Sequence, residues 1–177
     1  MEPYQYCPMC AGPLFDIEMM EDSGLKVRRR CKTCEWTHWN NPTPVLAAVI
    51  ELPEQEGRLL IARNAAWKTG MFGLVTGFME AGESPEDGIA REIAEETQLQ
   101  VDSLRLIGAY DFQRLNQVII AYHAVAHGEI RLSPELVEYR LVLPAEMRCW
   151  RAGTGLALAD FLRGCGIEPQ WLESSRA

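Results

Sequence analysis

The alternation of apolar and polar positions along the chain predicts a series of β-strands. Residues 45–52 form a nearly continuous apolar run with polar residues at its ends, which is typical of a buried strand. Residues 58–63 follow after a turn and pair back on this strand as a hairpin. Residues 104–111 and 117–126 predict two more strands, and residues 141–143 a further short one. Together with two helical segments, these strands indicate an α/β protein.

The first helix is predicted to begin directly after Ser84. Ser84 is a natural N-cap, Pro85 fits the first helical position, and Asp87 can close a capping box. A second helix is predicted over residues 154–163, with Thr154 as its N-cap. The apolar and small residues that recur at helical spacing predict the buried face of the first helix: Ile89, Ala90, Ile93, Ala94 and Thr97.

The other side of the first helix carries Arg91, Glu92, Glu95 and Glu96. Like charges one turn apart destabilise a helix by roughly 0.2–0.5 kcal/mol per pair, and only Arg91, through its i,i+4 relation to Glu95, is close enough in sequence to offset them. One interpretation is a solvated acidic face, which is the commonest meaning of a charge run. The other is a site for a hard cation with oxygen ligands, Mg²⁺ or Mn²⁺.

The whole segment from Gly77 to Leu99 favours the cation site. It matches the pattern Gly-x5-Glu-x7-Arg-Glu-U-x-Glu-Glu-x-Gly-U, in which U is aliphatic, at every fixed position but one. This pattern resembles the Nudix hydrolase box. The exception is Gln98, where the family has a glycine that ends the helix in a left-handed turn. A non-glycine residue in that conformation costs roughly 1–2 kcal/mol, so we expect the helix to run on or to end differently here.

The resemblance implies a fold and a chemistry. The fold is an α/β/α sandwich with a mixed β-sheet, and the reaction is the metal-dependent attack of water on a nucleoside diphosphate linked to another group. In that chemistry cations neutralise phosphate oxygens and lower the pKa of bound water. Arg91 is implied to orient the glutamates, Glu83 to brace the loop, and one glutamate to activate water. The implied ligands of Mg²⁺ or Mn²⁺ are Glu92, Glu95, Glu96 and the carbonyl of Gly77.

The six cysteines indicate a second metal site. Cys7 and Cys10 form one C-x-x-C motif, and Cys31 and Cys34 form another 20 residues later. Two such knuckles at this distance predict a structural Zn²⁺ site with four thiolates and no open position. Two disulfides are the alternative, which the absence of a secretory signal disfavours. A redox C-x-x-C is weaker still, because neither motif lies in a βα context.

The segment between the knuckles predicts a hairpin with its turn at residues 21–24, so the N-terminal part resembles a zinc ribbon. The only basic cluster of the chain lies on the hairpin's returning strand and just beyond it, at Arg28, Arg29, Arg30 and Lys32. That cluster is interpreted either as a solvated strand edge or as a docking surface for RNA or substrate phosphate. The aromatic residues that follow, Trp36, His38 and Trp39, are expected to pack the ribbon against the next domain, with stacking on a base as the alternative.

A stiff joint at residues 40–44 separates two predicted domains. We place the zinc ribbon at 1–40 and the Nudix domain, including the C-terminal helix, at 41–177. A ribbon ahead of such a domain resembles the NADH pyrophosphatase branch of the family. The segment 134–138 resembles a part of that branch which contributes one more metal-binding glutamate, and the match places this role on Glu135. The segment Gly153–Thr154 weakly resembles its C-terminal nucleotide-pocket segment.

One stretch departs from that branch. Residues 108–116 stand where NADH pyrophosphatases carry a Ser-Gln-Pro-Trp-containing run, and none of that run is present beyond an aromatic position. We therefore expect an adenine-containing pyrophosphate in general, namely ADP-ribose, FAD or NADH. Trp67, Tyr110, Phe112 and Thr154 are candidate substrate contacts. The alternative for the three aromatic residues is ordinary packing in the core or in loops.

Composition limits the partners. The net charge of −8 argues against a broad nucleic-acid footprint, and the 47% hydrophobic content is enough for a packed core. No apolar run approaches a membrane span and no signal segment is evident, so we expect a cytoplasmic protein with a small nucleotide as substrate. The family resemblance also allows a homodimer. Removal of a nucleotide cap from RNA and a non-catalytic nucleotide- or RNA-binding module are the alternative functions; the intact glutamates argue against the second.

Overall fold

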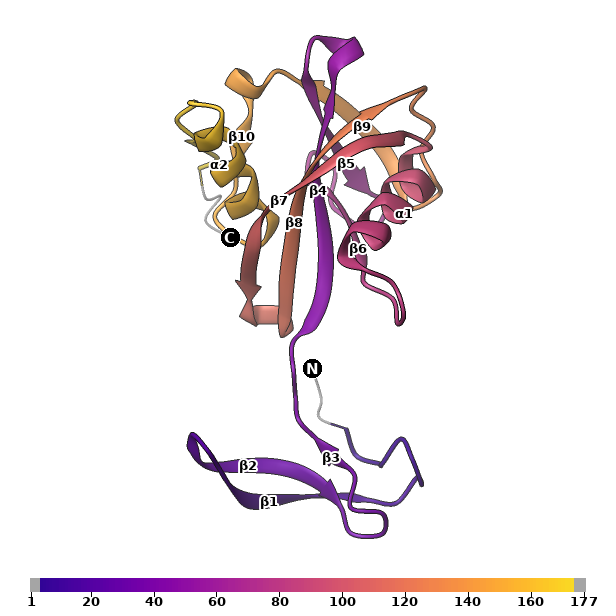
Figure 1. The fold of residues 1–177 in the computed structure, drawn as a ribbon, viewed down its shortest axis with the longest axis vertical. Helices are drawn as coiled ribbons and strands as arrows, with labels where there is room; N and C mark the ends of the chain where they lie inside the picture. The colour runs from indigo at the N-terminus through magenta and orange to yellow at the C-terminus, as the bar shows by residue number, and fades with distance from the viewer. Residues whose placement is uncertain (1–3, 174–177) are drawn as a thin grey trace. The chain divides into compact units, whose positions relative to one another are not determined.

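The computed structural model describes residues 4–173. The chain divides into two compact units, Met1–Pro42 and Thr43–Ala177. The first unit is built on an antiparallel three-stranded sheet in the order β1-β2-β3 (Figure 1). Its strands are β1 (Leu14–Glu21), β2 (Gly24–Cys31) and β3 (Thr37–His38).

The predicted hairpin between the knuckles is confirmed. β1 and β2 pair from Leu14 opposite Cys31 to Glu21 opposite Gly24, so the turn consists of residues 22 and 23. The buried core of this unit is small, with Cys7, Leu14 and Cys31 packed together and Trp36 against them. A core of this size is too small to stabilise a fold by itself, which is the usual reason for a structural metal.

The aromatic residues that we expected at a contact between domains have partners within the ribbon. The His38 ring lies edge-on to Tyr4 at 4.9 Å and stacks on Trp36 at 6.0 Å, both measured between ring centroids. The guanidinium of Arg28 lies 5.8 Å from the ring centroid of Trp39, whose side chain is half exposed. These contacts extend the small core of the ribbon with aromatic surface.

The second unit contains a six-stranded sheet and two helices. The sheet runs β7-β8-β4-β5-β9, and β6 also pairs with β4. β4 and β8 are parallel and the other pairs are antiparallel, so the sheet is mixed, as predicted. The elements are β4 (Thr43–Leu52), β5 (Arg58–Asn64), β6 (Val75–Phe78), α1 (Pro85–Thr97), β7 (Gln100–Phe112), β8 (Gln117–His127), β9 (Leu136–Val142), β10 (Arg148–Cys149), α2 (Thr154–Gly164) and β11 (Gln170–Trp171).

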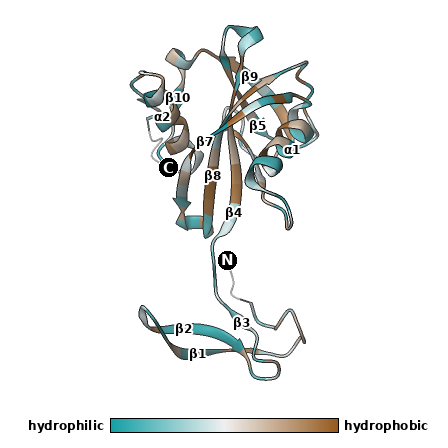
Figure 2. Ribbon diagram, viewed as in Figure 1, coloured by the Kyte–Doolittle hydropathy of each residue, from teal (hydrophilic) through white to brown (hydrophobic). Residues whose placement is uncertain are grey.

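The two helices cover opposite faces of this sheet (Figure 1). On one face Ile89 and Ile93 of α1 pack against Leu46 and Ile50 of β4. On the other face the core includes Leu158 and Leu162 of α2 together with Val49 and Leu59. Hydrophobic residues are concentrated along β4 and β8, the two central strands (Figure 2). The predicted α/β/α sandwich is therefore confirmed. Neither helix in the described range has the length and apolar composition to cross a bilayer.

Two details of the helices differ from prediction. Gly153, not Thr154, is the N-cap of α2, and Thr154 is the first helical residue. α1 ends at Thr97, and Gln98 adopts the left-handed conformation with φ 59° that the sequence disfavours. Tertiary hydrogen bonds fix this end: the N–H of Arg131 donates to the carbonyl of Thr97 at 2.9 Å, and Leu99 beyond the turn is buried. Burial of Leu99 offsets the local backbone strain at Gln98.

Candidate active site

The helix that carries the glutamates begins as the sequence predicted. Ser84 Oγ accepts a hydrogen bond from the N–H of Asp87 at 3.1 Å and donates one to its carboxylate at 2.7 Å. Pro85 occupies the first turn, where its missing N–H removes no helical bond. This cap fixes the start of α1, and the helical period then aims Glu92, Glu95 and Glu96 along one side.

Arg91 holds the surrounding carboxylates by hydrogen bonds. Its Nε and Nη2 donate to the two oxygens of Glu83 at 3.1 and 3.0 Å, a bidentate pair. Its Nη1 donates to Glu92 at 2.9 Å and to Glu95 at 3.1 Å, and Nη2 also donates to the carbonyl of Phe78 at 3.3 Å. The guanidinium lowers the pKa of Glu83, and the same bonds raise the pKa of Arg91. Arg91 thus joins the loop, β6 and the helix face through one planar group.

Gly77 allows a glutamate to approach the sheet. A Cβ at this position would lie 1.8 Å from Cδ of Glu92 and 2.0 Å from its Oε1, far inside any tolerated contact. Only the absence of a side chain lets the Glu92 carboxylate lie against the backbone of β6. The glycine that begins the box is therefore explained by packing against Glu92.

Glu96 is the most perturbed acid of the second unit. Its side chain is only 7% exposed, and burial first, then the charges of Glu92, Glu135 and Glu95, raise its pKa to about 7. Glu135 is brought there by the backbone, since the N–H of Ser133 donates to the carbonyl of Glu96 at 2.9 Å. Two acids 39 residues apart in sequence thus come close enough for the charge of Glu135 to raise the pKa of Glu96.

These residues line a single cavity of about 520 Å³. Five carboxylates and one guanidinium face it, so its charge is strongly negative: Glu80, Glu92, Glu95, Glu96, Glu135 and Arg91. A buried acid with a raised pKa, a carboxylate cradled on Gly77 and a purely oxygen donor set fit a hard divalent cation. The arrangement offers ligands for such an ion beside space for a small molecule.

A family model of the NUDIX domain matches residues 42–163, which is more than half of the chain. The chain belongs to the Nudix family. Among curated proteins it is similar to the NAD-capped RNA hydrolase NudC of Vibrio parahaemolyticus, with 27% identity over 76% of this chain and 48% of that protein. The corresponding protein of Pseudomonas putida is 26% identical over 76% of this chain and 46% of its own length. The chain thus spans about half the length of the curated relatives it matches.

Solved structures extend the Nudix likeness to nearly the full chain. A Nudix hydrolase from Nitrosomonas europaea matches with a TM-score of 0.73 and 25% identity, covering 96% of this chain and 97% of that one. An ADP-ribose pyrophosphatase from Streptococcus suis matches with a TM-score of 0.58 and 19% identity, over 75% of this chain and all of that one. At that identity the second likeness concerns the fold alone.

The candidate substrate contacts separate into two groups. Trp67 lines the cavity. Its ring packs so closely on Gly73 that a Cβ at that position would lie only 2.8 Å from the nearest ring atom. Tyr110, Phe112 and Thr154 are not part of the lining. Phe112 packs in the core beneath α2, and the hydroxyl of Tyr110 donates to Asp160 of that helix. Both residues are on β7, which β8 separates from β4 and the catalytic cavity.

Sequence reasoning missed several lining residues. Phe78, 60% exposed, lines the cavity and directly follows Gly77, the first residue of the box, so its position in the motif was a signal that could have found it. Val45 and Gln117 reach the cavity because β4 runs parallel to β8, with Thr43 opposite Gln117. Pairing between strands about 70 residues apart has no local signature, so no pattern in the sequence could have placed Gln117 there.

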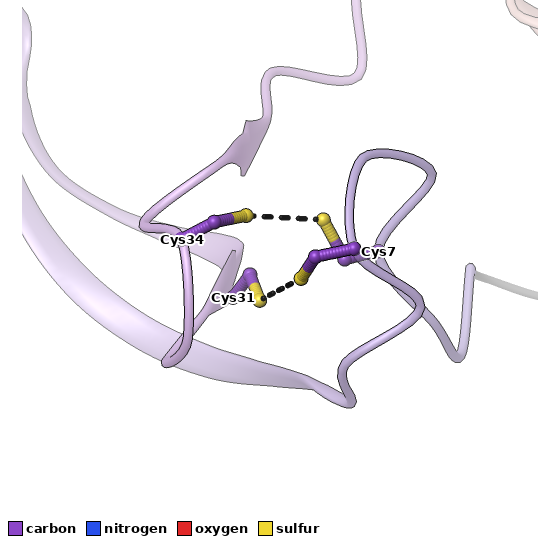
Figure 3. A group of neighbouring side chains, drawn as sticks. Cys7, Cys31 and Cys34 are labelled. Carbon is purple, nitrogen blue, oxygen red and sulfur yellow. Dashed lines mark hydrogen bonds between the residues drawn. The ribbon is translucent and has the colours of Figure 1, made fainter.

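The four knuckle cysteines converge in the first unit (Figure 3). Their sulfur atoms all lie within 4.8 Å of one another, and none forms a disulfide. The Sγ atoms of Cys7 and Cys34 are 3.5 Å apart, as are those of Cys10 and Cys31. Within residues 4–173 this is the one acid, histidine or cysteine group whose ligand atoms converge so closely. The set fits a tetrahedral ion with soft ligands.

The two knuckles repeat one backbone geometry. In each, the residue after the second cysteine donates its N–H to the first cysteine's carbonyl, and that residue, Ala11 or Glu35, has a positive φ. The N–H of Cys7 donates to the carbonyl of Gly12 at 2.8 Å, and the N–H of Cys31 donates to the carbonyl of Trp36 at 2.9 Å. Backbone N–H groups of Cys34 and Thr33 lower the pKa of Cys31, whereas hydrogen bonds from neighbouring sulfurs raise the pKa of Cys10 and of Cys34. Without a metal ion the group therefore favours the thiolate form at Cys31 and the thiol form at Cys10 and Cys34.

The basic cluster of the ribbon is largely paired. Arg28 makes a bidentate pair with Glu21 at 2.7 and 3.0 Å and donates to the carbonyl of Trp39 at 2.8 Å. Arg29 pairs with Asp16 at 3.0 Å, and Arg30 pairs with Glu35 at 3.2 Å. The arginines thus tie the hairpin to its flanking segments, which favours the strand-edge interpretation of this cluster.

Proposed function

We propose that this protein is a divalent-metal-dependent pyrophosphohydrolase that cleaves the phosphoanhydride of a nucleoside diphosphate joined to another group. The observation that carries the proposal is the cavity in which five carboxylates face one guanidinium. Such an excess of like charge is unstable without a cation, and burial together with the neighbouring glutamates raises the pKa of Glu96 to about 7. A substrate with a bridging diphosphate would bring further negative charge that only a cation could neutralise.

We assign each of these residues a role that its position or contacts support. Glu92, Glu95, Glu96 and Glu135, with the carbonyl of Gly77, are the proposed ligands of Mg²⁺ or Mn²⁺. When bound, such ions lower the pKa of water and screen the phosphate oxygens. Arg91, bonded to Glu83, Glu92 and Glu95, holds these carboxylates in position and keeps the loop before α1 against the helix.

The substrate class is proposed to be an adenine-containing dinucleotide, with NAD in either redox state, FAD and ADP-ribose as the candidates. Trp67 and the exposed Phe78 border the cavity beside the glutamates, and flat aromatic side chains suit a base or a nicotinamide ring. The names of the curated relatives, which act on NAD-capped RNA, support an NAD-linked diphosphate.

The test is a hydrolysis panel with Mg²⁺ or Mn²⁺, containing NADH, NAD⁺, FAD, ADP-ribose, diadenosine polyphosphates and nucleoside triphosphates. We expect release of AMP from at least one dinucleotide. The Glu96→Gln variant should lose that activity by orders of magnitude while remaining folded. Full turnover by Glu96→Gln, or equal turnover of a diphosphate without a purine, would contradict the proposal.

Removal of a nucleotide cap from RNA is the second candidate, and the names of the relatives favour it. The paired arginines of the ribbon weaken the idea that this segment grips RNA. The two functions separate in one comparison of kcat/KM, with NAD⁺ and a short 5′-NAD-capped RNA as substrates. A large preference for the RNA that falls steeply with added salt would assign the function to cap removal.

The four cysteines are proposed to bind a structural Zn²⁺. Four thiolates leave no open coordination position, so the ion would stabilise the ribbon and take no part in hydrolysis. Because the core of this unit consists of a few residues, metal binding would supply much of its folding free energy.

A further inference from the structure

A second cavity of about 470 Å³ lies beside α2, where β7 forms the edge of the sheet. It is bordered by β7, by the loop before α2, by α2 and by β11. Two arginines and two large aromatic side chains surround it, which is unusual for a unit whose charge is mostly negative: Tyr110, Arg151, Leu156, Ala159, Asp160, Arg163 and Trp171.

The charges around this cavity do not cancel. One oxygen of Asp160 accepts the hydroxyl of Tyr110 at 2.8 Å, and the other accepts Nη1 of Arg163 at 2.6 Å. Asp160 is thus matched by Arg163. Arg151 makes no ion pair with any residue of the described range, and its guanidinium instead lies over the ring of Trp171. The cavity therefore has one positive charge without a partner, and Arg163 retains further N–H donors.

The unpaired arginine lies on an aromatic surface. The guanidinium carbon of Arg151 is 4.9 Å from the centroid of the Trp171 ring, within the range of a cation–π contact. Leu156 and the buried Ala159 of α2 add apolar wall. A planar guanidinium beside an indole gives a flat platform on which an aromatic ring can stack, with N–H donors at its rim for an anion.

A flat ring joined to an anion is the chemistry of a nucleotide. We propose that this cavity is a nucleotide-binding subsite, in which the base stacks at Trp171 and Arg151, and the phosphate binds Arg151 and Arg163. A free nucleoside monophosphate and a nucleotide within an RNA strand offer the same chemistry. The RNA source rests on the proposed hydrolase function, whereas binding of a free nucleotide does not.

The subsite lies one row of side chains away from the catalytic cavity. Tyr110 of β7 is directly opposite Ile119 of β8, which is opposite Val45 of β4, and all three pack in one cluster. Val45 lines the catalytic cavity and Tyr110 lines the subsite. Two strand spacings separate them, about 10 Å. Ile119, which lies between them, is buried next to Gly153 at the start of α2. A nucleotide chain that joins the two cavities would therefore pass around this end of the helix.

Binding is tested by calorimetric titration of the full chain with AMP in buffer without divalent cations. Under these conditions the five carboxylates of the catalytic cavity repel the phosphate, so binding reports the subsite. We expect saturable binding that Arg151→Gln weakens by roughly tenfold or more. Arg148→Gln is the matched control, because Arg148 is exposed and nearby but outside the cavity, and it should leave the affinity unchanged.

Inorganic phosphate is the second probe. If AMP binds at least several-fold more tightly than phosphate, and Trp171→Ala removes that advantage, the stacking platform is supported. No AMP binding, equal affinity for phosphate, or equal weakening by Arg148→Gln would overturn the subsite.

The source of the nucleotide is resolved by kinetics with Mg²⁺. If Arg151→Gln lowers kcat/KM for a 5′-NAD-capped oligoribonucleotide but not for NAD⁺, the subsite holds a nucleotide of the RNA strand. If both values are unchanged while AMP binding is lost, the subsite binds a free nucleotide. Failure of all hydrolysis would refute the proposed function but leave the AMP titration, and hence the subsite, standing on its own result.

Discussion

The buried charge of Glu96 should make the metal-free protein lose stability as the pH rises. Burial and three neighbouring glutamates raise its pKa from an ordinary 4.5 to about 7. Between these two values the folded chain binds more protons than the unfolded chain. The free energy of unfolding must therefore fall as the pH rises through this window, and the fall is complete above pH 7.

The size of the effect follows from the two pKa values. Each pKa unit corresponds to 1.36 kcal/mol, so the difference between 4.5 and about 7 amounts to about 3 kcal/mol at pH 8. For a unit of this size that loss corresponds to a fall in Tm of about 10 °C. Glu96→Gln keeps the shape of the side chain but cannot ionise. At pH 8 the variant should therefore be more stable than the unaltered protein, and at pH 4.5 nearly equal to it.

The assay is thermal unfolding followed by circular dichroism between pH 4.5 and 8.5, without divalent cations. Glu95→Gln is the control: the Glu95 side chain is 61% exposed and its charge makes the smallest contribution to the raised pKa of Glu96, so this substitution should leave most of the pH dependence in place. Added Mg²⁺ at pH 8 should raise the Tm of the unaltered protein more than that of Glu96→Gln, because a ligand stabilises the state that binds it. Parallel Tm curves for Glu96→Gln and the unaltered protein over the whole pH range would refute the reasoning.

Three substitutions test other parts of the structure. Gln98→Gly should raise the free energy of unfolding in urea by about 1 kcal/mol, because glycine adopts the observed left-handed φ without strain; a loss of stability would show that the side chain contributes contacts. Gly77→Ala should weaken Mn²⁺ binding, measured by electron paramagnetic resonance, by tenfold or more, because the new Cβ would lie 1.8 Å from the carboxyl carbon of Glu92. Gly164→Ala is the control: no atom lies within 4 Å of its Cβ position, so Mn²⁺ binding should be unchanged. Cys31→Ser should release zinc to a chromogenic chelator and destabilise the ribbon, while Cys165→Ser, an exposed cysteine outside the cluster, should retain the full metal content.

Features with a local physical cause could be predicted from the sequence. The start of α1 is set by Ser84 and Pro85, whose capping chemistry acts within one turn. The spacing of Arg91, Glu92 and Glu95 places three charges on one side of a helix whatever the rest of the chain does. The knuckles form in the same way, because each C-x-x-C closes a turn through its own backbone hydrogen bonds.

Features that depend on contacts between distant segments could not be predicted. The sequence gives no sign that Tyr110 bonds to Asp160, away from the catalytic cavity, since the two are 50 residues apart. The left-handed Gln98 is disfavoured locally, and its conformation follows from the burial of Leu99.

The sequence by itself determined the chemistry of this protein: a carboxylate-rich helix and two cysteine knuckles, both encoded by spacings shorter than five residues within each motif. The tertiary structure alone decided what surrounds that chemistry. The parallel pairing of β4 with β8 carries Gln117 to the catalytic cavity, and packing of α2 on the sheet forms the second cavity at Arg151. The physical reason is that helix periods and turns are local properties of the chain, whereas strand register is chosen by burial across the whole fold.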